Sequence, residues 1–227
     1  MSRVPFPDVT GRRLRAPSRT SFAGDGMASL GHASMNATNV TWKDLHEAAQ
    51  DFGVSPRAII SAAWGYVLYL YVTHECDNVA FDAVDAVDAD TCVAISFGPS
   101  LCRWEDPISM VQLSEKAWLS DRHVQIHGPV LFVSAPDQDT QSALSLAEST
   151  LSRTNSSLSL VFIAHQAHTS TSSSSSHPVA LTLLASPSVH IHGSAMTQLA
   201  QVEHVLHALV HRLDLTKCCL LYTSDAA

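Results

Sequence analysis

The segment at 56–72 constrains the fold most strongly, because apolar side chains occupy almost every position in it. Ser55 and Pro56 open the segment, and this pair is typical of a helix N-cap followed by proline at the first helical position. A helix that is apolar on every side must be covered by other elements all round. We therefore predict that residues 56–72 form the central helix of a folded core.

Helical and strand-like patterns alternate along the rest of the chain. Thr41 and Asp44 resemble a capping box at the start of a helix over 42–52, which Gly53 would end. Short apolar runs with no polar interruption are typical of buried strands. This pattern of elements predicts an α/β fold. The expected strands lie at 78–87, 95–102, 129–135, 158–164, 179–185 and 188–192, and the other expected helices at 108–119, 143–151 and 194–213.

Composition excludes several classes of protein. The chain has 227 residues, of which 46% are hydrophobic and 15% charged, as in a folded domain rather than a disordered one. A net charge of -8 argues against a nucleic-acid binder that depends on attraction to phosphates. No apolar run is long enough for a transmembrane helix. Five cysteines without a C-x-x-C motif favour reduced thiols, so we expect a cytoplasmic location.

Residues 1–40 differ in character from the rest. Arginine is frequent in the first twenty residues and Asp8 is the one acidic residue there, which is a pattern shared with transit peptides. Pro5, Pro7 and Pro17 would interrupt the amphipathic helix that such a peptide needs. We favour an extended connector rich in proline and arginine over 1–40, with a targeting segment as the alternative.

No catalytic residue and no metal ligand are assigned from the residues alone. The acidic residues at 75–90 lack the loop glycine and the final glutamate of an EF-hand, which favours a solvated loop or strand edge. The chain has no G-x-S-x-G, no P-loop and no G-x-G-x-x-G motif. The acidic set comprises Glu75, Asp77, Asp82, Asp85, Asp88 and Asp90.

The thirteen histidines are the other candidates for a metal site. His204, His207 and His211 fall opposite the apolar stripe of the expected last helix, where a solvated face is the simpler interpretation. The spacing of His207 and His211 is that of a zinc-binding pair, but no glutamate follows the first histidine. The pairs His123 with His127 and His190 with His192 could also bind a metal, and surface positions are again favoured over a metal centre.

Residues 54–71 read V-S-P-R-A-I-I-S-A-A-W-G-Y-V-L-Y-L-Y, and 77–81 read D-N-V-A-F. These segments resemble the helix and the following strand of the condensation domain in nonribosomal peptide synthetases, particularly the fungal type. Residues 97–103, 177–184 and 198–213 are similar to later strands and the final helix of that domain. The resemblance implies one lobe, the C-terminal one, of a two-layer sandwich like chloramphenicol acetyltransferase, with a mixed sheet and flanking helices over 41–218. It also implies that Gly98, Pro99 and Arg103 line one wall of a substrate tunnel.

The family's catalytic H-H-x-x-x-D-G motif is absent from this sequence. In the family, that motif precedes every segment matched here. The resemblance therefore implies a truncated and inactive fragment, whose parent forms amide bonds between aminoacyl or peptidyl thioesters. Its partners would be the missing N-terminal lobe and carrier domains bearing phosphopantetheine, with no cofactor in this chain; a siderophore assembly line is one candidate parent. The alternatives are a non-catalytic domain for carrier docking or other interactions, and a fragment of a CoA-dependent small-molecule acyltransferase.

The last nine residues, 219–227, read C-L-L-Y-T-S-D-A-A. This string resembles one translated reading frame of a transposon-end adapter used in sequencing libraries. We therefore expect 219–227 to be a non-native tail and leave it out of the fold. Cys219 would then not belong to the native cysteines.

Overall fold

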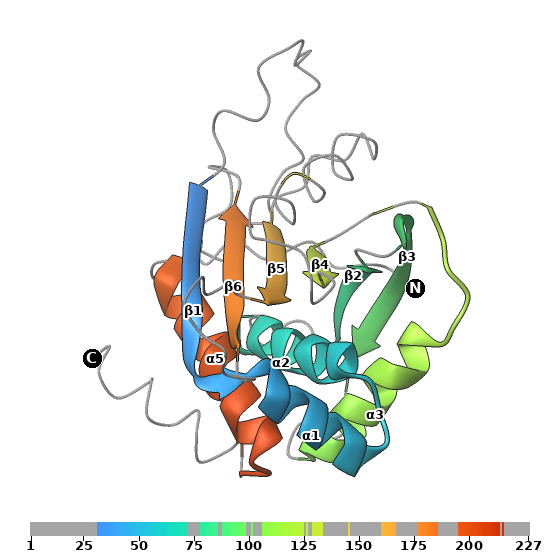
Figure 1. Ribbon diagram of the computed structural model, residues 1–227. Coiled ribbons are helices and arrows are strands. Elements are labelled where there is room, and N and C mark those ends of the chain that lie inside the picture. Colours follow the sequence, from blue (N-terminus) through green and yellow to red (C-terminus); the bar gives the residue numbers. More distant parts are fainter. Residues whose placement is uncertain are drawn as a thin grey trace.

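A computed structural model describes the chain at 31–71, 78–85, 88–98, 101, 106–124, 126, 129–133, 145, 160–166, 177–185, 195–213 and 215. These parts form a six-stranded sheet with helices packed on it, as Figure 1 shows. The architecture is α/β with two layers, as predicted. No helix among the described residues is long and apolar enough to cross a membrane.

The sheet is mixed, with the strand order β1-β6-β5-β4-β2-β3. The pairs β1–β6, β6–β5 and β2–β3 are antiparallel, whereas β5–β4 and β4–β2 are parallel. Strands β4 and β5 are the short apolar runs that the sequence predicted as buried. The bounds are Gly31–Thr41 for β1, Val79–Asp85 for β2, Asp88–Phe97 for β3, Val130–Val133 for β4, Leu160–Gln166 for β5 and Pro178–Ala185 for β6.

The first two helices begin where the sequence placed their caps. In α1 (Trp42–Phe52), the hydroxyl of Thr41 accepts from the amide of Asp44 at 3.2 Å, and the Asp44 carboxylate accepts from the Thr41 amide at 2.8 Å. Gly53 ends this helix with φ at 66°, a left-handed conformation that glycine adopts without strain. The capping box and the glycine stop are thus confirmed. The remaining helices are α2 (Pro56–Tyr71), α3 (Pro107–Trp118) and α5 (Ala195–Val210).

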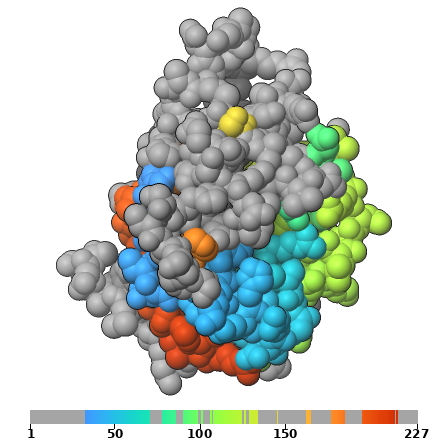
Figure 2. All heavy atoms as spheres, viewed as in Figure 1, coloured from blue at the N-terminus to red at the C-terminus, as the bar shows by residue number. Residues whose placement is uncertain are grey.

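Helix α2 lies at the centre of the helical layer. Its side chains from Ala58 to Leu68 are buried, apart from Gly65, which has no side chain. It contacts α1, α3 and α5 as well as the sheet. Figure 2 shows the same arrangement on the surface, where α1 and α2 in blue and cyan lie between α5 in red and α3 in green. The predicted central helix is confirmed.

The two faces of the sheet have different surroundings. On the face toward the helices, alternate residues such as Phe81, Ile95 and Phe162 belong to the main hydrophobic core. On the opposite face, Val84, Phe132 and other residues are also buried but lie outside that core. The site described below lies on this second face.

Two predicted starting residues differ from those in the structure, one for the folded domain and one for a strand. Residues 31–41 form β1, an edge strand paired with β6, so the folded unit includes at least ten residues before the predicted boundary at 41. Strand β3 begins at Asp88, not at the predicted 95, because it pairs with β2 along most of its length. The segments 1–30, 143–151 and 188–192 and the tail at 219–227 lie, apart from residue 145, outside the described residues.

Candidate functional site

Of the three residues predicted to line a tunnel wall, the structure describes Gly98. Gly98 is buried directly after β3, and its carbonyl accepts a hydrogen bond from the amide of Leu101 at 2.8 Å. This hydrogen bond joins residues three positions apart directly after β3. Pro99 and Arg103 lie outside the described residues, so their place along a tunnel stays a prediction.

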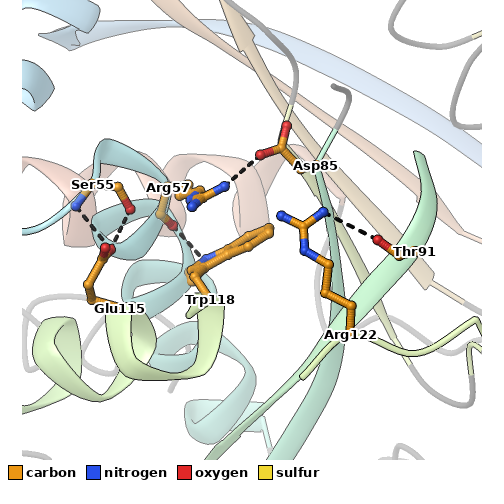
Figure 3. Close-up of polar contacts among 8 residues, drawn as sticks. Ser55, Arg57, Asp85, Thr91, Glu115, Trp118 and Arg122 are labelled. Atoms are coloured by element: carbon orange, nitrogen blue, oxygen red, sulfur yellow. Dashed lines mark hydrogen bonds and ion pairs between the residues drawn. The ribbon is translucent and has the colours of Figure 1, made fainter. Parts of the chain in front are cut away.

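A polar network joins the start of α2 to α3 and β2 (Figure 3). Arg57 forms an ion pair with Asp85 at 2.7 Å, and its guanidinium lies 4.8 Å from the ring centre of Trp118. The indole Nε1 of Trp118 donates to the hydroxyl of Ser61 at 2.9 Å, and this hydroxyl donates to the Arg57 carbonyl at 2.8 Å. These contacts satisfy buried polar atoms and fix α3 against α2, which is a structural role.

The same helix pair is joined a second time at the N-cap of α2. Glu115 on α3 accepts hydrogen bonds from the amide of Ser55 at 3.0 Å and from the Ser55 hydroxyl. Its negative charge lies at the N-terminus of α2, where the helix dipole favours an anion. Glu115, a residue of α3, thus caps the N-terminus of α2.

A different cluster on the second face of the sheet brings together Asp82, Cys92 and His123. Asp82 lies in the middle of β2 opposite Ala94, and Cys92 lies opposite Val84, so Asp82 and Cys92 are diagonal neighbours on one face. His123 follows α3 and forms an isolated backbone bridge with Cys92, at 2.8 and 2.9 Å. This bridge places the imidazole next to both other side chains.

The side-chain distances in this cluster are short. The Cys92 sulfur lies 3.2 Å from Nδ1 and 3.9 Å from Nε2 of His123. Nε2 lies 3.7 Å from Oδ1 of Asp82. Asp82 is 1% exposed and Cys92 is 2% exposed, whereas the His123 side chain is 31% exposed. A thiol, an imidazole and a buried carboxylate therefore converge at a place that solvent reaches from the histidine side.

The sequence did not predict this cluster. Asp82 was expected on a solvated loop or strand edge with its acidic neighbours, and this is wrong, because β2 is an inner strand between β4 and β3. His123 was paired with His127, which lies outside the described residues. Phe81 and Ala83 on either side of Asp82 are buried, and their apolar character was the available signal that this aspartate lies inside a strand.

His204 and His207 on α5, and His211 directly after it, do not form such a cluster. His204 and His207 are partly buried and His211 is exposed, close to the solvated face that was predicted. Burial and the nearby charges of His211 and His204 lower the pKa of His207. Glu203 lies beside them on α5, and sequence reasoning did not single it out. Its side chain is buried, and Oε1 accepts hydrogen bonds from the amides of Thr38 and Asn39 at 2.5 and 3.0 Å.

No family model and no curated protein matches the chain. Solved structures do. The condensation domain of MokA, the monacolin K polyketide synthase, aligns with 94% of this chain, and the alignment covers 54% of the MokA chain. The TM-score is 0.58 and the sequence identity is 10%. The EpoB cyclization-docking bidomain of a peptide synthetase from Sorangium cellulosum matches 80% of this chain, which covers 42% of the bidomain, with a TM-score of 0.55 and 12% sequence identity. The first condensation domain of the calcium-dependent antibiotic synthetase matches 84% of this chain, which covers 47% of that domain's chain, with a TM-score of 0.54 and 10% sequence identity.

These similarities establish the fold of this chain as that of condensation domains, as the sequence resemblance implied. The chain spans about half the length of the solved structures that it matches.

Proposed function

We propose that this chain is the C-terminal lobe of a condensation domain from a peptide synthetase, of the fungal type. The observation that carries the proposal is the match to condensation domains over about half of their length. The absence of H-H-x-x-x-D-G from the sequence supports it, because that motif belongs to the other half of the fold. A cytoplasmic location belongs to the same proposal.

In the proposed parent enzyme, the amine of one carrier-bound substrate attacks the thioester of another. A C–N bond forms, the C–S bond breaks, and the proton that the amine loses ends on the departing phosphopantetheine thiolate. A histidine at the lobe interface assists this step as a general base or by positioning the amine. This chain contributes one wall of the tunnel through Gly98, Pro99 and Arg103, while phosphopantetheine arms on carrier domains bring the substrates. The histidine is supplied by the other lobe, so this chain alone forms no amide bond.

Two measurements test the proposal. The first is the genomic sequence upstream of Met1, where we expect an open frame that contains H-H-x-x-x-D-G. A promoter and an in-frame stop codon at that place would instead identify a separate interaction domain. The second incubates the purified chain with two loaded carrier domains and follows the carriers by intact-protein mass spectrometry. We expect no peptidyl carrier from the chain alone, and product once the upstream lobe is expressed with it; product from the chain alone would refute the proposal.

A further inference from the structure

The second face of the sheet carries a set of side chains that the proposed function does not use. Asp82, Cys92 and His123 each offer one ligand atom, and these atoms all lie within 4.8 Å of one another. We propose that they form a binding site for one zinc ion. This inference is independent of the proposed function, since the tunnel residues are not part of the cluster.

The distances suit a tetrahedral ion after small side-chain movements. Zinc lies about 2.3 Å from sulfur and about 2.0 Å from nitrogen or oxygen, so the ligand atoms of a tetrahedral site are about 3.3 to 3.6 Å apart. Nε2 of His123 lies 3.9 Å from the Cys92 sulfur and 3.7 Å from Oδ1 of Asp82. These two pairs are therefore within about 0.6 Å of the required separation, and the third pair, the Cys92 sulfur and the Asp82 carboxylate, lies within 4.8 Å.

The backbone holds the ligands in place before any ion binds. Asp82 and Cys92 are fixed by the β2–β3 pairing, and the amide of Asp82 donates to the carbonyl of Pro129 at 2.9 Å. The isolated bridge between Cys92 and His123 fixes the third ligand against the edge of β3. Ligands on paired strands lose little conformational freedom when they bind a metal, and this favours affinity.

The charges and the donor types both favour zinc. Cys92 is a thiol rather than half of a disulfide, and as a ligand it loses its proton to solvent when the metal–sulfur bond forms. One thiolate, one carboxylate and a neutral imidazole then balance a divalent ion, so a neutral unit is buried instead of a separate charge. Mixed sulfur, nitrogen and oxygen ligands select zinc over magnesium or calcium, which prefer oxygen alone. Three protein ligands leave the fourth position for water on the solvent side of His123.

The test titrates the full chain, freed of metal, with Co²⁺ as a spectroscopic substitute for zinc. In a variant in which serine replaces the other four cysteines, Cys92 is the remaining thiol. A thiolate-to-cobalt charge-transfer band then reports Cys92 alone. We expect this band to saturate at one Co²⁺ per chain and to disappear when Zn²⁺ is added. The four replaced positions are Cys76, Cys102, Cys218 and Cys219.

Substitutions of the ligands separate this site from adventitious binding. We expect Cys92→Ser to abolish the band, and Asp82→Asn and His123→Gln to weaken Co²⁺ binding about tenfold or more. The control His46→Gln changes a histidine on the exposed face of α1 and should leave the titration unchanged. Because His123 lies at the exposed edge of the sheet, His123→Gln decides the question even if Cys92→Ser fails to fold. The absence of a band in the wild type, or an unchanged titration in His123→Gln, would overturn the proposal.

Discussion

Replacement of Gly65 by alanine tests how α2 packs on the sheet. At an ordinary helical position this change stabilises a protein by about 1 kcal/mol, because alanine has the higher helix propensity. Here a Cβ atom would lie 2.2 Å from Cε2 and 2.5 Å from Cδ2 of Phe97, whose ring is fully buried. Ordinary carbon contacts begin near 3.4 Å, so the ring must move by more than 1 Å. The packing cost and the propensity gain therefore oppose each other.

The packing cost exceeds the gain in helix propensity. Overpacking of a core costs about 1 to 3 kcal/mol, and such a close contact places Gly65→Ala at the upper end of that range. After subtraction of the propensity gain, we expect a net loss of about 2 kcal/mol in the free energy of unfolding. For a chain of this length the midpoint temperature then falls by about 4 to 8 °C. Urea denaturation followed by circular dichroism measures the loss directly, with an unchanged slope.

A double-mutant cycle identifies the cause. Phe97→Leu removes the ring atoms that meet the new methyl group, so it should cost at least about 1 kcal/mol less in the Gly65→Ala background than alone. Gly53→Ala is the matched control, because φ there is 66° and nothing lies within 4 Å. It should cost about 1 kcal/mol through backbone strain and show no coupling to Phe97→Leu. Gly65→Ala as stable as the wild type, or no coupling in the cycle, would refute this account of the packing.

Three further predictions concern polar groups at the helices. Glu203→Ala should lower the free energy of unfolding by about 2 to 4 kcal/mol in urea denaturation, because it leaves two amides without their charged acceptor. The control Glu47→Ala, on the surface of α1, should cost less than about 0.5 kcal/mol. Asp44→Ala should remove half of the capping box with Thr41 and cost about 1 kcal/mol; no loss of stability would contradict the capping contacts. Burial and neighbouring histidines lower the pKa of His207, so the unfolded chain binds more protons and stability falls as the pH drops below about 6.5. His207→Gln should flatten this fall in thermal unfolding measured between pH 5 and 7, and an unchanged profile would count against the prediction.

Local patterns in the sequence were sufficient for the helices of the described residues and for one strand. Helix α2 was predictable because its burial on every side requires apolar residues at almost every position. The start of α1 was predictable because Thr41 and Asp44 bond to each other within one turn. Strand β4 was predictable because a strand covered on both faces is a continuous apolar run. In each case the structural cause lies within a few residues of its signal.

The candidate site had no such local signal. Asp82 and Cys92 are ten positions apart in the sequence, and only the register of β2 against β3 makes them neighbours on one face. A shift of that register by one residue would direct Asp82 to the other face of the sheet. His123 joins them through a backbone bridge to Cys92 that no periodicity predicts. The resemblance to condensation domains did not help, because it assigns these positions no role.

Strand β1 shows why a boundary can depend on a residue far along the chain. Residues 31–41 contain alanine, serine, asparagine and threonine, a composition with a weak strand signal. The strand nevertheless pairs with β6, and its register shifts between Asn36 and Thr41. At this irregularity the ladder cannot satisfy every amide, and the buried carboxylate of Glu203 on α5 accepts from those of Thr38 and Asn39. A charged residue on the last helix therefore stabilises the irregular end of the first strand, and a boundary prediction based on local pattern alone starts the domain at 41.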